Sequence, residues 1–297
     1  MSATLFWRLG AVLGASGVAL GAFGAHGLKS MLAGHPDAQR KQENWATAAH
    51  YQLIHAAALL ALSTRMQSLG LPRLQPSRAA MAGWLLVAGV AGFSGSIYLL
   101  VLDTRRAFSR FLGPVTPLGG VCFIAGPSPL LSVLALILRN RSRKTPVTLG
   151  YHRPHPHHQP PSPSRLTMSA SMFWKLGAGL GASGVVLSAF GAHGLRPMLK
   201  GQADTQSKQV RWSTAAYYQL VHAAALLALS ARMQAGALVA PRAALAGWLF
   251  VAGIAGFSGT IYINVFNKNR LITRIIHIIT PQGGMCLIAG WLLLAFS

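Results

Sequence analysis

The stretch GAFGAHGL at residues 21–28 guides the interpretation of the whole chain, because FGAHGL returns at residues 190–195 behind another alanine. A phrase that recurs at a fixed spacing indicates an internal repeat, and the repeat then defines the architecture. The opening of the chain behaves in the same way: MSATLFWRLG at 1–10 returns as MSASMFWKLG at 168–177. The chain therefore contains one unit twice.

The two copies align along nearly their whole length. Trp45 corresponds to Trp212 at an offset of 167 residues, and Pro117 corresponds to Pro281 at an offset of 164. The three-residue difference falls in the loop after the second apolar stretch of each copy, and surface loops are where insertions are tolerated. The two cysteines, Cys122 and Cys286, are too few and too far apart for a disulfide framework or a zinc site.

Composition places the chain in a membrane. Of its 297 residues, 52% are hydrophobic and only 10% are charged, and the formal net charge is +22. Soluble domains carry about a quarter charged residues. The basic residues occupy short gaps between long apolar runs, which is typical of a multi-span membrane protein with basic loops. A nucleic-acid-binding protein would gather them in polar segments. We therefore expect the lipid bilayer, and no nucleic acid, as a partner.

Each copy contains four apolar stretches, and a helix needs about 20 apolar residues to cross the hydrocarbon core. The stretches lie at 4–25, 46–63, 80–102, 111–138, 172–192, 213–231, 243–266 and 275–296. The sequence predicts an all-α membrane protein with two tandem four-helix transmembrane bundles and about eight spans. Because four spans return the chain to its starting side, the copies should be parallel repeats.

Three domains follow from this division: a first bundle at 1–138, a linker at 139–167 and a second bundle at 168–297. The linker is rich in Pro, Ser, Arg and His and should be disordered, since it cannot bury a core. Its four histidines could bind a metal, but a solvated linker is the simpler interpretation; they are His152, His155, His157 and His158.

The first copy stops matching the second after residue 126, where Pro127 and Pro129 replace the apolar end of the last stretch. Prolines inside a span should kink or break it. Since the second copy also opens with its own Met168, we hypothesise that two adjacent genes, or a mis-joined gene model, were fused through the linker. If the linker is discounted, the basic residues favour a cytoplasmic location for loops one and three. The sequence does not identify the membrane.

Small residues form a seam along the first span of each copy, with alternating steps of four and three residues. In lipid, close contact at small residues holds helices together. The seams are Gly10, Gly14, Gly17, Gly21 and Gly24 in the first copy, and Gly177, Gly181, Gly184, Ser188 and Gly191 in the second. The third spans carry shorter versions, so we expect the first and third spans to pack together. Gly27 should end the first helix at the membrane face.

Candidate functional residues are the polar groups that both copies share within or beside their spans. Gln52 and His55 lie three apart on one helical face, and His26 follows the glycine seam. Such groups are often functional, although they can also simply link helices by hydrogen bonds. The six candidates are His26, Gln52, His55, His193, Gln219 and His222.

The phrases GAFGAHGL, W-x-T-A-x-x-Y-Q-L-x-H-A (45–56 and 212–223) and T-P-x-G-G (116–120 and 280–284) together resemble a known family. The family comprises small four-span membrane proteins of the YwdK and transmembrane protein 256 type. Their shared domain is called domain of unknown function 423. The resemblance covers 1–126 and 168–297 and implies a four-helix membrane bundle with no established activity. The duplication and the prolines in the fourth span of the first copy depart from the family pattern.

Three functions remain open. The first is a structural or assembly protein that acts through lateral helix contacts with other membrane proteins or with further copies of itself. The second is a small-solute or proton permease that uses the intramembrane His and Gln side chains, because histidine titrates near physiological pH. The third is haem or metal ligation by histidine. We expect no enzyme and no obligatory cofactor, because the four acids offer no shared carboxylate pair; they are Asp37, Glu43, Asp103 and Asp204.

Overall fold

A computed structural model describes residues 3–67, 76–103, 107–125, 165–202, 204–236, 238 and 240–297, and the regular elements in these ranges are all helices. The first copy contains α1 (Ala3–Ala25), α2 (Gly27–Met31), α3 (Ala38–Gln67), α4 (Pro76–Gly89), η1 (Val90–Gly95), α5 (Ser96–Leu102) and α6 (Ser109–Ala125). The second contains α8 (Arg165–Ala189), η2 (Phe190–Gly194), α9 (Leu195–Met198), α10 (Thr205–Gln234), α11 (Ala240–Gly253), η3 (Ile254–Gly259), α12 (Thr260–Phe266) and α13 (Arg270–Ala295).

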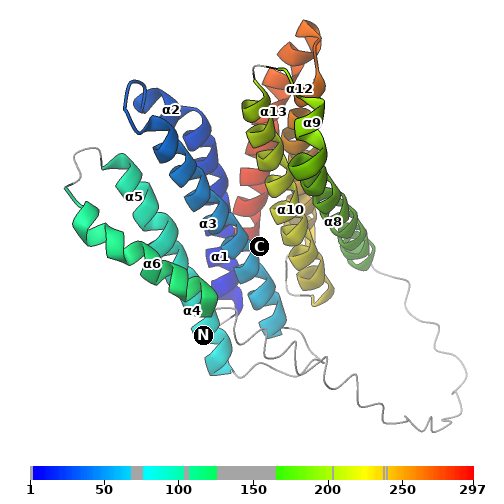
Figure 1. Cartoon of the computed structure of the whole chain (residues 1–297). Coiled ribbons are helices and arrows are strands. Elements are labelled where there is room, and N and C mark those ends of the chain that lie inside the picture. The colour runs from blue at the N-terminus through cyan, green and yellow to red at the C-terminus, as the bar shows by residue number, and fades with distance from the viewer. Residues whose placement is uncertain are drawn as a thin grey trace, which may run out of the picture.

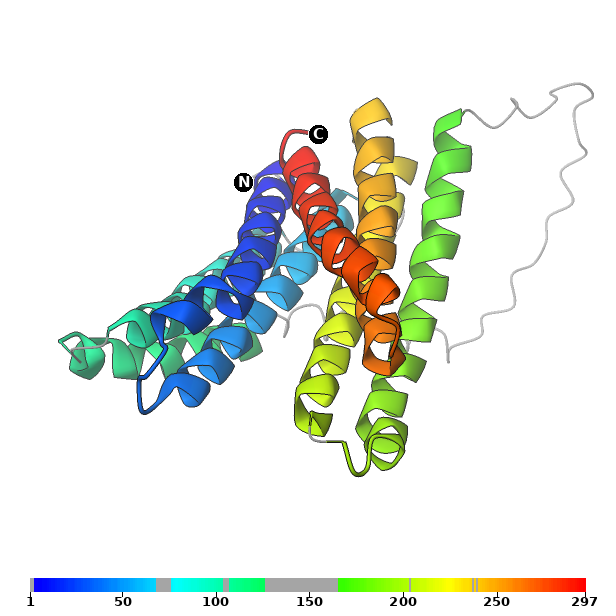
Figure 2. The ribbon, with the colours of Figure 1, turned by 90° about the horizontal axis from the view of Figure 1, so that it is seen from above.

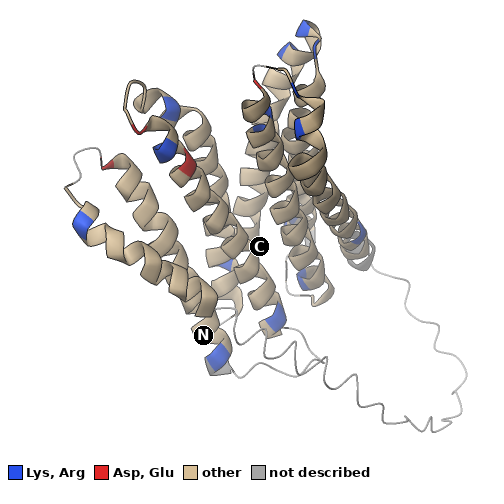
Figure 3. Cartoon of the chain, viewed as in Figure 1, with Lys and Arg blue, Asp and Glu red and all other residues tan. Residues whose placement is uncertain are grey.

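The two copies run in the same direction, as expected for parallel repeats. The short helices α2 and α9, which follow the first span of each copy, lie at the same end of the molecule (Figure 1). Lys, Arg, Asp and Glu concentrate toward the ends of the helices and leave the long middle sections without charge (Figure 3). This distribution suits helices that cross a bilayer, because a charge at the bilayer centre is costly.

Five helical segments in the described part of the chain are long and apolar enough to cross a membrane: Ala3–Ala25, Arg78–Leu102, Ala170–Met198, Pro241–Phe266 and Arg270–Ala295. The second helix of each copy, α3 and α10, is 30 residues long but polar in its first turns. The fourth helix of the first copy, α6, has 17 described residues. The chain is thus an all-α, multi-pass membrane protein in two tandem copies, and five segments of its described part meet both criteria.

The seam of small residues packs against a different helix from the one expected. The Cα atoms of Gly10 and Gly17 face Leu60 and Leu53 of α3, where an added Cβ would lie 3.2 and 3.1 Å from the leucine methyls. The third span pairs with the fourth in the same way, since a Cβ at Gly92 would lie 3.1 Å from the Gly119 Cα. Small residues allow this close approach. The helices therefore pair first with second and third with fourth.

The first and third spans meet near the start of the first helix, where an aromatic ring packs directly on a glycine. The Phe6 ring covers Gly83 and stands edge-on to Trp84 at 5.8 Å between ring centroids. The second copy repeats this contact with Phe173 and Trp248 at 5.7 Å. Periodicity identified the packing faces, but two candidate neighbours were available for each face and the sequence did not distinguish them.

The third span of each copy contains a π-helical turn at its centre, η1 in the first copy and η3 in the second. Such turns are uncommon and interrupt the regular hydrogen-bond ladder. Both occupy the sequence G-F-S-G, and both face the fourth helix. Their recurrence at corresponding positions marks them as a property of the repeated unit.

The largest buried apolar cluster belongs to both copies. It joins Trp7, Ala11 and Val18 of α1 to residues of α10, α11 and α13, among them Leu226 and Trp291. Viewed from above, α1 and α13 lie side by side at the centre, with α4–α6 on one flank and α8 on the opposite flank (Figure 2). The two bundles therefore share a core, which the sequence did not predict.

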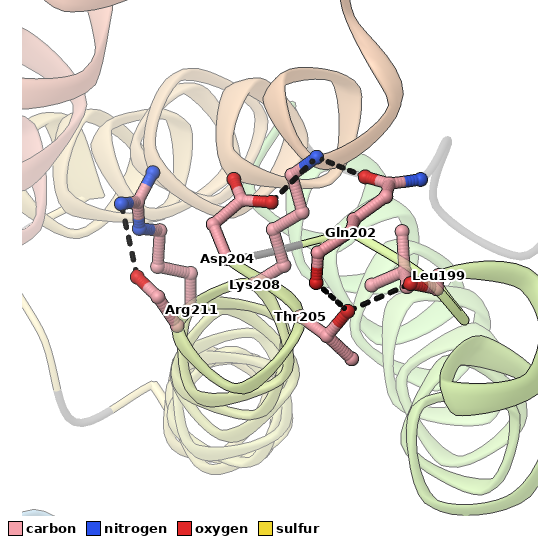
Figure 4. A network of polar contacts seen from close by, with 7 residues as sticks. Leu199, Gln202, Asp204, Thr205, Lys208 and Arg211 are labelled. Atoms are coloured by element: carbon pink, nitrogen blue, oxygen red, sulfur yellow. Dashed lines mark hydrogen bonds and ion pairs between the residues drawn. The ribbon is translucent and has the colours of Figure 1, made fainter.

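A polar network at the turn between α9 and α10 precedes the long second helix of the second copy. Thr205 Oγ1 donates to the backbone oxygens of Leu199 at 2.7 Å and Gln202 at 2.8 Å, and Lys208 bridges the Gln202 amide oxygen and Asp204 (Figure 4). Gly201 adopts a φ of +87°, which glycine tolerates best. The acidic Asp204 is thus part of a helix-end network.

Several expectations fall on residues 126–164, which lie outside the described ranges. These are the limits of the three domains near 138 and 139, the disorder and metal binding of the linker, and the effect of Pro127 and Pro129 on the fourth span. They remain predictions. At the first helix end, α1 stops at Ala25 and Gly27 instead begins α2.

Candidate functional site

A glutamine lies at the centre of the first bundle and connects three of its helices. The Gln52 amide nitrogen, on α3, donates to the Leu13 carbonyl at 2.9 Å and to Ser16 Oγ at 2.8 Å, both on α1. Tyr98 on α5 donates its hydroxyl proton to Gln52 Oε1 at 3.1 Å. Both ends of the amide are therefore satisfied inside the bundle, as a buried polar group requires.

The second bundle repeats this network almost without change. Gln219 donates to the Leu180 carbonyl at 2.8 Å and to Ser183 Oγ at 2.9 Å, and Tyr262 donates to Gln219 Oε1 at 3.1 Å. The same three hydrogen bonds hold the glutamine in both copies. The glutamine is therefore a link between helices that belongs to the repeated unit.

His222 is completely buried and has partners for both ring nitrogens. Its Nδ1 lies 2.7 Å from the Tyr218 carbonyl, and its Nε2 lies 3.0 Å from the indole nitrogen of Trp291 on α13. The indole can only donate, so Nε2 must accept and the proton must be on Nδ1. The ring is therefore neutral in this arrangement and joins the second helix to the fourth.

His55 has the same sequence context but different surroundings. Its Nδ1 lies 2.7 Å from the Tyr51 carbonyl, and its ring stacks on Phe123 of α6 at 3.5 Å between centroids. The position of Trp291 corresponds to Pro127 in the first copy, so no equivalent indole exists. His55 is only half-buried, and within the described ranges no hydrogen bond reaches its Nε2.

His26 and His193 lie away from the other four candidates. Both are exposed at the end of the first helix, beyond the glycine seam. The structure brings Gln52 and His55 onto one helix, but Gln52 faces α1 and α5 while His55 faces α6. The six residues thus do not form one site: each glutamine joins its own interior network, His55 and His222 contact their fourth helices, and His26 and His193 lie at exposed helix ends. Any functional role for them remains a prediction.

The T-P-x-G-G phrase forms a polar seam that the sequence analysis did not assign to any contact. Thr116 of this phrase shares a hydrogen bond with Ser96 at 2.6 Å, and Thr280 shares one with Thr260 at 2.7 Å. Its first glycine, Gly119, lies so close to the π-helical turn that an added Cβ would overlap the Phe93 backbone. The threonine, the proline and the two glycines recur in both copies. This recurrence was the feature of the sequence that could have indicated a contact between helices.

Two tryptophans and a glycine make one group of close contacts between the two copies. The Trp7 indole nitrogen of α1 donates to the Leu294 carbonyl of α13 at 2.8 Å. In return, the Trp291 indole of α13 lies against Gly14 of α1, where an added Cβ would overlap the ring. Each copy thus inserts a tryptophan into the other, and all of these side chains are buried.

An arginine completes this junction. The Arg232 guanidinium lies 4.4 Å from the centroid of the Trp7 ring and donates to Ser63 Oγ at 2.8 Å. Arg232 is 1% exposed. A buried cation over an indole face is stabilised by the ring quadrupole. Since Arg232 comes from the second copy while Ser63 and Trp7 come from the first, this contact also links the copies.

Metal ligation would need several donors in one place. Among the residues that the structure describes, no group of three or more His, Cys, Asp or Glu side chains converges. Cys122 and Cys286 are free thiols on separate helices.

The repeated unit matches a model of a protein family described as "Protein of unknown function (DUF423)", at residues 20–120 and again at 187–284. The chain belongs to the DUF423 family. The two matched regions correspond to the two copies and span most of the chain, so the tandem arrangement of this DUF423 protein is a property of the sequence itself.

Three relatives each match about the length of one copy. A UPF0382 membrane protein of Staphylococcus aureus is 38% identical over 122 residues, which are 41% of this chain and 88% of the relative. The UPF0382 membrane protein YwdK of Bacillus subtilis is 37% identical over 123 residues, 40% of this chain and 87% of the relative. One from Schizosaccharomyces pombe is 33% identical over 128 residues, 42% of this chain and 97% of the relative.

These relatives are named as membrane proteins, and none of the names states an activity. Each alignment covers nearly the whole relative but less than half of this chain, so one relative corresponds to one copy. No solved structure matches the chain. The family assignment therefore supports an uncharacterised integral membrane protein in a lipid environment.

Proposed function

We propose that the protein is a membrane assembly component whose bundles join laterally, with the fourth helix of one bundle seated on the first helix of another. The observation that carries the proposal is the Trp291 indole in the notch at Gly14. A bilayer provides no hydrophobic drive between helices, so a large ring that fills a backbone-lined notch is an effective way to hold them.

The polar groups of the junction support the same function. Trp7 and Arg232 meet at a single point between the copies, and their hydrogen-bond partners come from the opposite copy in both cases. Interfaces gain much of their free energy from buried aromatic and arginine anchors of this kind. The proposal assigns no catalytic role to the chain, and the positions of the acids at helix ends support that view.

The proposal is tested by cutting the full chain between its copies. A protease site inserted between Gly150 and Tyr151 is cleaved in detergent, and the two halves are purified through a tag on one of them. We expect the halves to stay together in the unmodified protein and to separate in Gly14→Ile, because the new side chain overlaps Trp291. Gly179→Ile is the matched control, since no atom lies within 4 Å of its Cβ.

Two results would contradict this proposal. Halves that separate without any substitution would mean that the junction does not hold the bundles. Halves that stay together in Gly14→Ile, with helix content unchanged by circular dichroism, would show that the Trp291 contact is not what joins them.

A permease is the second candidate, and His55 is the observation that favours it. Its half-buried ring has no described hydrogen-bond partner at Nε2, in contrast to His222. A neutral imidazole with an available nitrogen can accept and release a proton. Proton flux into liposomes that is unchanged in the double variant His55→Ala, His222→Ala would exclude this function.

A further inference from the structure

The first helices of the two copies carry the same face, but only one of them is covered. On α1 this face consists of Trp7, Ala11, Gly14, Ala15 and Val18, here called the α1 face. The corresponding residues of α8 are Trp174, Ala178, Gly181, Ala182 and Val185, here called the α8 face. All five residue types are identical at the repeat offset of 167.

Burial differs sharply between the two faces. Trp7 and Val18 are 0% and 2% exposed, whereas Trp174 and Val185 are 50% and 60% exposed. At Gly181 an added Cβ would find only Ala223 of its own bundle, at 3.8 Å, and no indole. The same set of residues thus binds a helix in the first copy, whereas in the second copy no helix of the described part of the chain lies against it.

The structure also shows what covers the α1 face. The end of α13 lies on it, with Trp291 over Gly14 and the Leu294 carbonyl accepting from Trp7. An equivalent helix for the α8 face would have to come from the fourth span of the first copy. That span carries Pro127 where Trp291 stands. Its described part, α6, lies on the flank opposite α8 (Figure 2).

The chain therefore has two acceptor faces with identical residues, and among the described residues only the fourth helix α13 is seated on one of them. A contact of this head-to-tail kind does not close on itself and leaves an acceptor free at one end. A second copy of the chain would supply another α13, but that helix is already seated on its own α1 face. The similar proteins each match one copy over most of their own length, so a protein of that size would bring a fourth span without a second copy's first helix joined to it.

We propose that the α8 face is a docking site for the fourth-span helix of a separate single-bundle protein of this family, an apolar membrane helix with an indole at the Trp291 position. This inference rests on the proposed assembly function and names its partner. The ring would fill the notch at Gly181, and Trp174 would donate to a backbone carbonyl near the end of the docked helix, as Trp7 does within the chain.

The test uses the full-length protein in phosphatidylcholine vesicles and a synthetic peptide of residues 270–297 as the probe. A donor dye is attached to Ser171→Cys in a Cys122→Ser, Cys286→Ser background, and an acceptor dye is attached to the peptide at its C-terminus. We expect saturable energy transfer that weakens by about tenfold or more with Gly181→Ile, because the notch is then filled. A peptide with Trp291→Ala should lose a similar amount.

Gly179→Ile again provides the control on the same helix, and it should leave the binding unchanged. Equal binding by Gly179→Ile and Gly181→Ile, or no preference over a scrambled peptide, would mean that only lipid covers the α8 face and would overturn the proposal. Loss of binding with Gly14→Ile instead would mean that the peptide exchanges with α13 at α1, which also overturns it.

Two further outcomes separate this inference from the assembly proposal. If the full chain alone forms dimers that Gly181→Ile abolishes, a second copy occupies the α8 face and the named partner is wrong. If peptide binding fails while the cleaved halves still stay together through Gly14, the assembly function stands and only the docking site falls.

Discussion

The α1 and α8 helices carry the same sequence pattern but occupy different environments. The α1 face lies in the core that joins the two copies, whereas the α8 face is largely exposed. Their residues are identical, so the difference arises from their neighbours and not from the helices. Amino-acid type can indicate that a face is suited to helix packing, but the presence of a partner determines whether that face contributes to stability.

The largest expected difference between the copies concerns the paired tryptophans. Trp7→Ala should lower the free energy of unfolding by about 3–5 kcal/mol, because it removes a buried ring and leaves a cavity. Trp174→Ala should cost much less, since that ring is half exposed. Unfolding in mixed detergent–SDS micelles measures both values. Equal losses would show that the two faces are equivalent in solution.

Substituting alanine for the two corresponding glycines should change the stability of the protein in opposite directions. Gly14→Ala should destabilise the protein by about 1–3 kcal/mol, because its methyl group overlaps Trp291 and forces the helices apart. Gly181→Ala should be neutral or stabilise the protein by up to about 1 kcal/mol, because alanine is the better helix former and 3.8 Å of space is available. Thermal denaturation in detergent provides the comparison. A melting temperature that falls as far in Gly181→Ala as in Gly14→Ala would contradict the difference.

The histidines should show a smaller asymmetry. Each variant, His222→Phe and His55→Phe, loses the contact between Nδ1 and a backbone carbonyl, but only His222→Phe leaves the Trp291 indole N–H without an acceptor. A buried donor without a partner costs about 1–3 kcal/mol, so His222→Phe should be more destabilising by that amount. The same micelle unfolding assay measures the difference between the two variants. A larger loss of stability in His55→Phe would contradict this expected asymmetry.

The smallest effect should be equal in the two copies. Tyr98→Phe and Tyr262→Phe each remove one hydrogen bond to a glutamine Oε1 at 3.1 Å. Interhelical hydrogen bonds in membranes contribute about 0.6 kcal/mol on average, and we expect both variants to fall near that value. This pair calibrates the others, because the tyrosine–glutamine hydrogen bond has the same length in both bundles. Unequal losses would mean that the bundles differ inside as well as at their junction.

Much of the interior architecture could be predicted from sequence. The shared Gln52 and Gln219 indicated a polar contact on one helical face, and both indeed lie inside their bundles. The pairing of helices could not be predicted, because the seam of Gly10 and Gly17 shows only that some helix approaches closely. Whether that helix is the second or the third depends on loop geometry and on the fit of distant side chains.

The difference between His55 and His222 was also beyond sequence reasoning. Each histidine is the last residue of the same Y-Q-L-x-H phrase. Their surroundings diverge because Trp291 reaches His222, while the corresponding position in the first copy is Pro127. The substitution was visible in the sequence, but its consequence required knowing that the fourth helix crosses over the second.

Taken by itself, the sequence determined the repeat, the helical class, the membrane environment and the faces along which helices pack. These properties follow from periodicity and composition, which act locally along the chain. Only the tertiary structure decided that Trp291 of one copy fills the notch at Gly14 of the other and that the α8 face has no described partner. The physical reason is that a helix face specifies the shape of a complementary surface, whereas the position of its partner depends on the packing of the whole chain.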